Sequence, residues 1–540
     1  MVRDGEVAEA VAVREGKVLA VGSLASLRKR YPAASVDATF VNRVLIPGLI
    51  DPHIHVVLGG LLYAQPFVPP WPMASVEGMT DGYDSPEAFR ARVRELVAAA
   101  PADNSPVVVY GYHNLIQGPL DRSVLDEIAP SRPLLVWHYS GHDFYLNTAA
   151  LTQIGATPEI AKQFHGVDLT PEGELTGRIY EDAAFLILQR MGAVLLSPEA
   201  VARGTSRYFE ILRRAGVTTV ADLAYGVFGR ALEDQMIAAT WSQQKSGFRL
   251  YLVPEFRSFE REFGSPSAAV TVVKEMVGGV RNTVAPVLPR VKFFTDGAFY
   301  SQTMRLKPPG YLAGQSKGTE GLWVVGPGKI DPVIRPYMEA GLAAHIHSNG
   351  DAAQDATLDA LETLRQADRK EDLVIEHGGL FSPAQTQRAA ALGAKLSVAS
   401  HYAYYMSHDY SAPLGPDRSD WITPVGSLSR AGVTVALHSD APLATPMPLG
   451  AADVHLTRAT RSGDVYEPDQ ALTRYDALEA VTIDAARVLG LEAELGSISP
   501  GKRADFTVLD DNPLRVSGER WADIRIWGVV LGGEKRPVER

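Results

Sequence analysis

Two histidines close an apolar run near the start of the chain. The run "LIPGLIDPHIHV", residues 45–56, carries His53 and His55 at its end. Residues two apart in a β-strand point to the same face, so both imidazoles can bind one cation. A buried strand that ends in this pair therefore predicts a metal site.

Further histidines follow other apolar runs. Seven of the 13 histidines fall at or near the predicted ends of strands: His53, His55, His345, His347, His377, His401 and His438. Asp440 ends the last run, in "LHSDAP". Its carboxylate could hold a metal and also accept a proton from water. Asp296 and Asp351 lie next to glycines in turns, where a capping role is as reasonable, and we leave them out of the metal set.

The strands that must position these residues alternate with helical stretches, as in parallel βα units. Eight strand candidates can be counted: "LIPGLIDPHIH", "GVTTVADLA", "FRLYLVPEF", "RVKFFTDG", "GLAAHIHSN", "DLVIEHG", "AKLSVASH" and "VTVALHSD". Eight is the number that closes a (β/α)8 TIM barrel, which keeps its chemistry at the C-terminal ends of the strands.

Three further segments surround the predicted barrel. Residues 56–210 are too long for one crossover and predict a folded insertion that covers the barrel mouth as a lid. Short glycine-punctuated runs at both ends predict one small β-sandwich domain built from residues 1–47 and 488–540. Residues 48–487, with the insertion, would then form the metal-binding TIM-barrel domain.

Composition restricts the partners. The chain has 540 residues, 46% hydrophobic and 21% charged, and its net charge of -11 argues against binding nucleic acid or an anionic membrane. A small-molecule substrate is expected, and a homodimer is left open. No cysteine is present, so a metal must be held by histidine, carboxylate or modified lysine. We find neither a secretory signal nor an apolar run long enough to span a bilayer, which predicts a cytoplasmic protein.

Several motifs together resemble a known family. "PGLIDPHIH", "KFFTDG", "HIHSNGD", "IEHGG" and "LHSDAPLATPMPL" are similar to strand motifs of the amidohydrolase superfamily, and "GSISPGKRADFTVLD" resembles its C-terminal sheet signature. The similarity covers nearly the whole chain. It points to amidohydrolase family 3, in the YtcJ-like branch that includes N-substituted formamide deformylase.

The resemblance implies a ligand set. His53 and His55 would bind one divalent metal, His347 and His377 a second, and a carbamylated Lys292 would bridge the two. Asp440 would be both ligand and general base. Zinc is the expected metal, in one or two ions per chain, although imidazole and carboxylate also admit manganese, iron or nickel. His345 shares a face with His347 and is the alternative ligand on that strand.

Other histidines are expected around the substrate. "SGHDFYLNTAAL" resembles a segment that this branch places over its pocket, so His142 could contact substrate or stabilise an oxyanion. His401 and His438 are candidates for substrate contact or for support of the ligands, and His345 for support. The aromatic stretches "HYAYY" and "GAFYSQ" would suit a substrate with an apolar body.

The predicted reaction is hydrolysis of a non-peptide carbon–nitrogen bond of a small molecule by metal-activated water. Cleavage of a lactone or ester, or deamination of a ring, would use the same ligands. A non-catalytic regulatory protein on this scaffold is a third hypothesis. It predicts the loss of a ligand or of the base, yet every expected residue is present.

Overall fold

The fold is taken from a computed structural model that describes residues 7–195, 197–367, 372–516 and 521–538. Eight parallel strands lie at its centre, in a three-stranded sheet β13-β12-β4 and a five-stranded sheet β14-β15-β16-β17-β18. They are β4 (Leu49–Ile54), β12 (Val217–Tyr225), β13 (Arg249–Pro254), β14 (Arg290–Phe294), β15 (Ala343–Ser348), β16 (Leu373–His377), β17 (Lys395–Ala399) and β18 (Thr434–His438). Each of the eight predicted strands is present.

The two sheets meet at both pairs of edges. A parallel bridge joins Glu255, after β13, to Lys292 on β14, and another joins Ile54 on β4 to Ala441, after β18. Helices connect successive strands: α10 (Arg230–Thr240), α12 (Phe256–Phe263), α13 (Pro266–Val277), α14 (Ile330–Glu339), α15 (Asp351–Gln366), α16 (Pro383–Ala391) and α20 (Val425–Arg430). This mixed α/β arrangement is a TIM-barrel-like fold.

Alternation along the strands explains the packing. Val374 and Ala436 belong to one buried cluster together with Ile50, whereas their neighbours Ile375 and Leu437 belong to a larger cluster that includes residues of the helices. Successive strand residues point to opposite faces, so each apolar run supplies both clusters.

The first predicted strand is divided in two. β3 (Val44–Pro47) pairs antiparallel with β19 (Phe506–Leu509), and only β4, beyond Gly48, joins the parallel sheet. A Cβ at Gly48 would overlap the side chain of Thr218, so the chain passes here only without one. A single apolar run thus serves two sheets.

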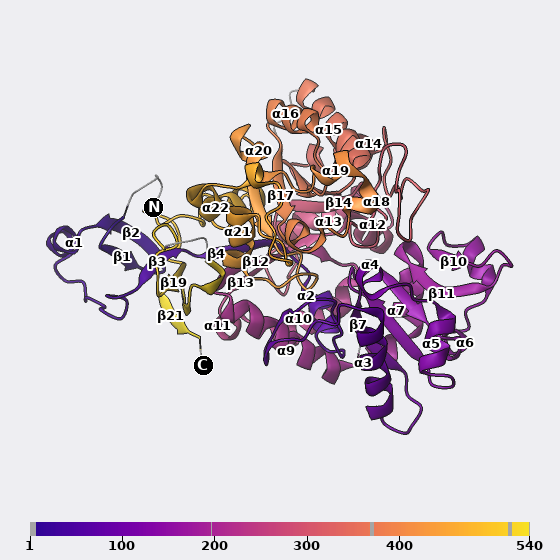
Figure 1. The fold of residues 1–540 in the computed structure, drawn as a ribbon. Coiled ribbons are helices and arrows are strands. Elements are labelled where there is room, and N and C mark those ends of the chain that lie inside the picture. Colours follow the sequence, from indigo (N-terminus) through magenta and orange to yellow (C-terminus); the bar gives the residue numbers. More distant parts are fainter. Residues whose placement is uncertain (1–6, 196, 368–371, 517–520, 539–540) are drawn as a thin grey trace.

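Both ends of the chain contribute to a small β region. A four-stranded sheet has the order β21-β20-β19-β3, with β20 (Ile526–Leu531) and β21 (Glu534–Pro537). The hairpin of β1 (Ala10–Arg14) and β2 (Lys17–Gly22) packs against it through Val18, which shares a buried cluster with Phe506 and Val530. Figure 1 shows the indigo N-terminal strands beside the yellow C-terminal ones.

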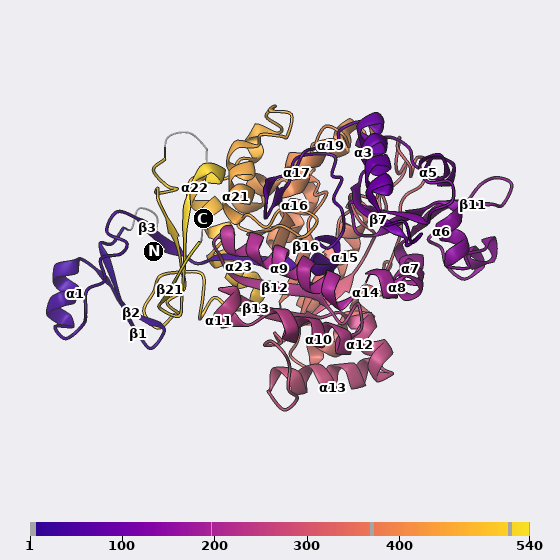
Figure 2. The ribbon, with the colours of Figure 1, turned by 90° about the horizontal axis from the view of Figure 1, so that it is seen from below.

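The predicted insertion has a sheet of its own. Its strands run in the order β10-β11-β9-β8-β7, and Figures 1 and 2 show them on the side of the barrel away from the chain termini. They are β7 (Val107–Tyr112), β8 (Leu134–His138), β9 (Asp143–Leu146), β10 (Val167–Leu169) and β11 (Leu175–Tyr180). The helices α2 (Val56–Leu62) and α9 (Pro198–Arg214) pack together at the points where the chain leaves and rejoins the barrel strands.

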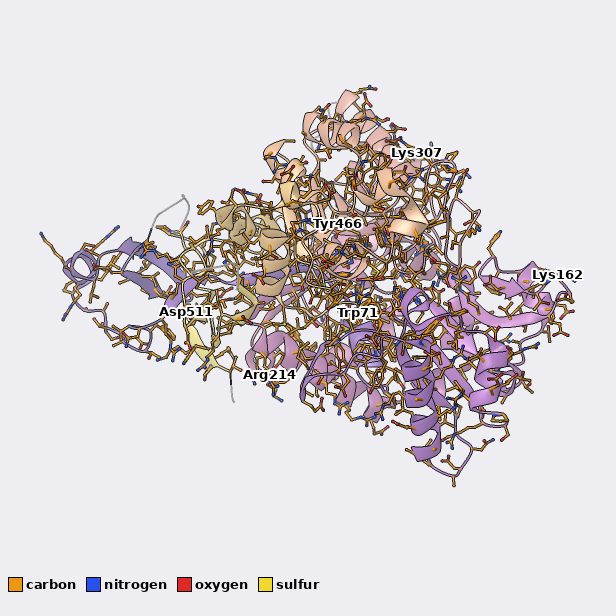
Figure 3. The ribbon with its side chains drawn as sticks, viewed as in Figure 1. Trp71, Lys162, Arg214, Lys307, Tyr466 and Asp511 are labelled. Atoms are coloured by element: carbon orange, nitrogen blue, oxygen red, sulfur yellow. The ribbon has the colours of Figure 1, made fainter. Side chains whose placement is uncertain are left out.

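The insertion contacts barrel segments that follow the C-terminal ends of strands. Trp71 stacks on Tyr405 of α17 (His401–Met406), the helix after β17, with ring centroids 4.3 Å apart. In Figure 3 Trp71 lies near the middle of the molecule, whereas Lys162 lies at the outer tip of the insertion. In the described parts of the chain, no helix combines the length and apolar character that crossing a membrane requires.

Candidate metal centre and active site

The end of β4 brings His53 and His55 to Asp440. The Nε2 atom of His55 lies 3.0 Å from Asp440 Oδ1, and that of His53 lies 3.5 Å from the same oxygen. Backbone bonds fix this approach, because the Asp440 amide donates to the His53 carbonyl (3.1 Å) and the His55 amide donates to the Ala441 carbonyl (2.8 Å). The pairing of first and last strands that was expected from the sequence thus assembles these three side chains.

A second group shares His53. The possible ligand atoms of His53, His377 and His438 all lie within 4.8 Å of one another, as do those of His53, His55 and Asp440. His438 Nε2 is 3.2 Å from His377 Nδ1. The geometry adds His438 to the candidate ligands, a role that sequence reasoning gave instead to substrate contact or support.

Unpaired buried atoms test whether these residues suit a metal. His53 Nε2, His55 Nδ1, Asp440 Oδ1 and Lys292 Nζ are buried and have no hydrogen-bond partner among the residues that the structure describes. Leaving buried polar atoms unpaired is costly, and a cation among imidazole nitrogens and a carboxylate oxygen would remove that cost. Such a donor set is one that binds zinc and similar divalent ions. The residues present therefore fit a divalent metal.

The protonation states of the candidate ligands also suit metal binding. Burial, reinforced by the charge of Lys292, lowers the pKa of His53 well below its ordinary value, and burial lowers the pKa of His438 to about 4. Both imidazoles are therefore neutral, the form that binds metals. Burial works against ionisation of Asp440, but the His55 imidazole 3.0 Å away brings the pKa of Asp440 down to about 2.

Glu376 binds two of the candidate histidines through their Nδ1 atoms, and sequence reasoning missed it. Its Oε2 accepts from His53 Nδ1 and its Oε1 from His345 Nδ1, both at 2.6 Å. Both ring nitrogens of His345 are then hydrogen-bonded, because Arg290 donates to its Nε2 at 3.2 Å. This gives His345 a supporting position. The available signal was a glutamate inside the apolar run "LVIEH".

Lys292 and His347 lie beside the two groups, and among the described residues His347 belongs to neither of them. Burial lowers the pKa of Lys292 to about 8, and its Nζ is 5.2 Å from the centre of the Phe294 ring. The ring of His347 is 4.5 Å from that of His377, and its Nε2 donates to the Gly297 carbonyl at 3.0 Å.

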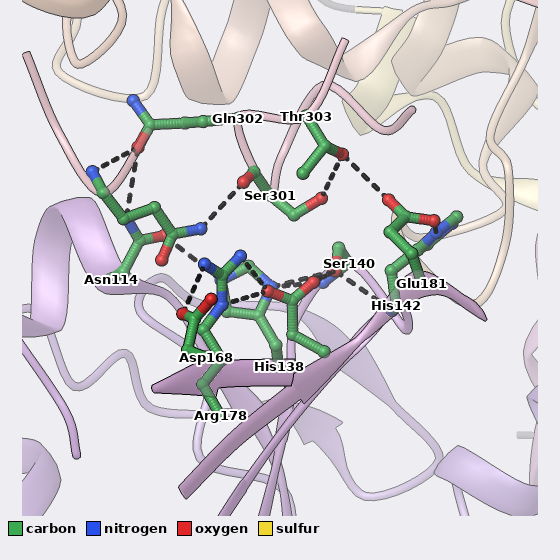
Figure 4. Close-up of polar contacts among 12 residues, drawn as sticks. Asn114, His138, Ser140, His142, Asp168, Arg178, Glu181, Ser301, Gln302 and Thr303 are labelled. Carbon is green, nitrogen blue, oxygen red and sulfur yellow. Dashed lines mark hydrogen bonds and ion pairs between the residues drawn. The ribbon is translucent and has the colours of Figure 1, made fainter. Parts of the chain in front are cut away.

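Two predicted substrate residues occupy different walls of the site. His401 is buried with both ring nitrogens unpaired, and it stacks parallel to Tyr300 at 5.5 Å. His142 lies on the insertion, where its Nδ1 donates to Glu181 at 3.1 Å (Figure 4). About a third of its side chain is exposed (33%), compared with 16% for His55, so solvent reaches this end of the site.

The two aspartates left out of the metal set have backbone partners. Asp296 accepts from the amides of Asn349, Gly350 and Arg305, and Asp351 accepts from the amide of Lys307 and from Arg418. These bonds hold the turns around β14 and β15.

Non-glycine residues with left-handed backbones gather here. His377 and Asp440 have φ values of 71° and 55°, and Glu181 has 45°. Such conformations cost free energy and persist where the surrounding structure imposes them, often at functional sites. At His377 the turn directly follows Glu376, so consecutive residues can both serve the same cluster.

Comparisons with known proteins find relatives that match nearly the whole chain. The putative amidohydrolase YtcJ of Bacillus subtilis is 25% identical, covering 99% of this chain and 97% of its own. N-substituted formamide deformylase of Arthrobacter pascens is 26% identical, covering 98% and 95%. A crystal structure of an uncharacterized metal-dependent hydrolase from Pyrococcus horikoshii superposes with a TM-score of 0.67 at 21% identity, covering 94% of each chain, which supports the fold.

The family assignment rests on the longest match. Residues 36–535 match the amidohydrolase family, and residues 10–34 match an imidazolonepropionase-like composite domain of bacteria. The first match includes both candidate metal groups and most of the terminal sheet. The resemblance read from the sequence is confirmed: the chain belongs to the amidohydrolase family.

Proposed function

We propose that the chain hydrolyses a small linear amide, with N-substituted formamides as the first substrates to test. As a member of the amidohydrolase family, it is a hydrolase that acts on carbon–nitrogen bonds other than peptide bonds. The observation that carries the proposal is the group of His53, His55 and Asp440, in which each residue has one buried atom without a hydrogen-bond partner among the described residues. The 26% identity to the formamide deformylase supports the choice of amide.

His53, His55, His377, His438 and Asp440 would hold the metal. We take zinc as the ion, in one or two copies. When bound, a divalent ion supplies Lewis acidity that makes water a nucleophile at neutral pH. Lys292 is proposed to carry a carbamate, because a buried ammonium would repel a cation. His347 would then serve a second ion, together with His377.

Asp440 performs the proton transfers. It is ionised and only 6% exposed, and it sits at the junction of the first and last strands. Its carboxylate accepts a proton from the attacking water and returns that proton to the departing amine nitrogen. Glu376 keeps His53 oriented, because it holds Nδ1 and leaves Nε2 facing Asp440.

The proposed architecture places the chemistry at one end of a closed (β/α)8 barrel. The bridges at both sheet edges support closure. Residues 56–210 would act as a lid that selects the substrate, and residues 1–47 and 488–540 would form a single β-sandwich. A second reaction, cleavage of a lactone or ester or deamination of a ring, is compatible with the same groups.

A substrate panel tests the proposal. N-substituted formamides and other linear amides are compared with matched esters and lactones, using wild type, Asp440→Asn and, as a control, Asp464→Asn at an exposed carboxylate. We expect the highest kcat/KM for an amide, and a loss of about 100- to 10,000-fold in Asp440→Asn only. Higher values for esters would overturn the substrate class, and activity surviving in Asp440→Asn would overturn the mechanism.

A further inference from the structure

A histidine–glutamate pair lies on the insertion, apart from the metal groups. His142 belongs to the turn between β8 and β9, and Glu181 follows β11, which pairs with β9. The two residues are bonded twice. The His142 Nδ1 donates to Glu181 Oε2 at 3.1 Å, and the Glu181 amide donates to the His142 carbonyl at 3.1 Å. The left-handed backbone of Glu181 adds a conformational cost that this arrangement must outweigh.

Glu181 also reaches across to the barrel. Its Oε1 accepts from the Thr303 hydroxyl at 2.8 Å, and the same hydroxyl accepts from the Ala298 amide at 2.9 Å. The neighbouring Gly297 carbonyl is the acceptor for His347 Nε2. Figure 4 shows the contact between Glu181 on the insertion and Thr303 on the loop after β14. A short series of bonds thus connects His142 to the turn that holds His347.

The turn that carries His142 rests on segments leaving the metal groups. A Cβ placed on Gly141 would lie 3.5 Å from Leu58 Cδ2 and 3.6 Å from Leu443 Cδ2. Leu58 comes three residues after His55, and Leu443 three residues after Asp440. His142 is therefore held at the rim of the site, with its side chain partly open to solvent.

The charges around His142 favour its protonated form. Acidic neighbours are Glu181, Asp143 and Asp440, and basic ones are His138, His347 and Arg178. Asp143 is neutralised by Arg178, whose Nη2 and Nε lie 2.6 and 2.9 Å from its Oδ2. Although burial opposes protonation, the charge of Glu181 raises the pKa of His142, whereas burial lowers the pKa of His347 to about 3. The charge of Glu181 thus favours a proton on His142, whereas burial keeps His347 neutral.

We infer that His142 is a cationic hydrogen-bond donor for a negatively charged oxygen of the substrate, and that Glu181 and Thr303 position it. The inference rests on the proposed hydrolase function. Glu181 occupies Nδ1, and within the described residues His142 Nε2 has no protein partner. The oxygen could be the carbonyl oxygen as it gains charge during attack, or a carboxylate already present on the substrate. Both need a fixed cationic donor at the rim.

A direct measurement tests the pair without any substrate. The metal-loaded protein is labelled at its imidazole rings, and the His142 signals are identified by their loss in His142→Gln. Glu181→Gln should lower the pH at which His142 titrates, and the exposed Glu174→Gln should leave it unchanged. Thr303→Val should lower it by a smaller amount, and Thr303→Ser, which keeps the hydroxyl, should restore it. An unchanged titration in Glu181→Gln would overturn the inference.

Kinetics with two matched amides then distinguish the source of the oxygen. One amide is neutral and the other bears a carboxylate. If His142 meets developing charge, His142→Gln lowers kcat about 100-fold on both amides. If it binds a carboxylate, KM rises for the acidic amide alone. His408→Gln, which removes an exposed histidine paired with Asp464, is the control and should change neither.

The outcomes separate the inference from the proposed function. If His142→Gln leaves kcat and KM unchanged for both amides while Asp440→Asn is inactive, the inference is overturned and the function stands. If the wild type hydrolyses neither amide, the function falls, and with it the inferred role of His142 in that reaction. Activity that survives in Asp440→Asn overturns only the proton transfers assigned to Asp440. In either case, the titration of His142 in wild type and Glu181→Gln still shows whether Glu181 favours the protonated form of His142.

Discussion

At the residue scale, the site depends on which ring nitrogen of each imidazole is hydrogen-bonded to a carboxylate. Glu376 holds Nδ1 of His53, and Glu181 holds Nδ1 of His142, with opposite consequences. Burial and neighbouring charge keep His53 neutral, with Nε2 free for a metal. At the partly open rim, Glu181 instead raises the pKa of His142. The same pairing therefore accompanies a lowered pKa at His53 and a raised pKa at His142.

Substitution of Glu376 tests its supporting role. Glu376→Gln removes the charge that orients His53, and we expect metal affinity to fall about 10- to 100-fold with the fold retained. Competition with a chelator, followed by metal analysis, measures the change. Glu362→Gln, at a half-buried glutamate paired with Arg388, is the control. Equal affinity in both variants would mean that His53 needs no acidic partner.

Sequence reasoning identified residues with local signals and missed those without. His53 and His55 are two positions apart in one apolar run, and Asp440 ends the last such run, so the sequence pattern alone brought them together. Glu376 is 323 residues from His53, and Thr303 is 122 from Glu181. Only the packing of the strands and the insertion in the folded chain makes these residues neighbours, and local sequence periodicity does not indicate such contacts.

At the element scale, continuous apolar runs predicted the parallel strands well, because strands covered on both faces need such runs. The division of the first run at Gly48 was not predictable. It depends on the close approach of Thr218, which is 170 positions further along the chain. The bonds that hold the loop after β12 could not be predicted from the sequence either. There Glu233 of α10 accepts from the amides of Gly226 and Phe228, both at 2.7 Å.

Glu233 should make stability depend on pH. Burial, with the nearby charge of Asp222, raises the pKa of Glu233 from 4.5 to about 8. Between these values the unfolded chain has released a proton that the folded protein retains, so the free energy of unfolding falls as pH rises. The contribution is fully present below pH 4.5 and is lost as pH rises through about 8. Its slope is at most about 1.4 kcal/mol per pH unit.

Glu233→Gln removes this dependence. Urea unfolding of wild type and variant across the window should show the variant gaining stability relative to wild type as pH rises. The variant also loses an acceptor, so the pH dependence of the difference is the quantity to read. Glu95→Gln, at an exposed glutamate of α3 (Pro86–Ala99), is the control. A difference independent of pH would show that Glu233 ionises normally in the folded protein.

At the scale of the whole molecule, the terminal sheet is fastened to the barrel by a buried ion pair. Arg249, the first residue of β13, donates to Asp505 through Nε at 2.7 Å and Nη2 at 3.1 Å. The Gly532 amide donates to the same carboxylate at 2.7 Å. One aspartate thus links a barrel strand with two C-terminal segments. Composition and motifs predicted a shared terminal domain, but they did not indicate how it is attached.

Breaking this link should destabilise the molecule more than a surface pair would. Asp505→Asn leaves Arg249 buried without its counter-charge, which costs about 3–5 kcal/mol. Glu494→Gln breaks an exposed pair with Arg503 on the same terminal segment, and we expect a cost of about 0–1 kcal/mol. Urea unfolding measures both, and adding Arg249→Met to Asp505→Asn should cost less than the two single changes combined, because the unpaired charge is then absent. If Asp505→Asn proves as mild as Glu494→Gln, apolar contacts such as those of Val18 with Phe506 would be what holds the terminal region together.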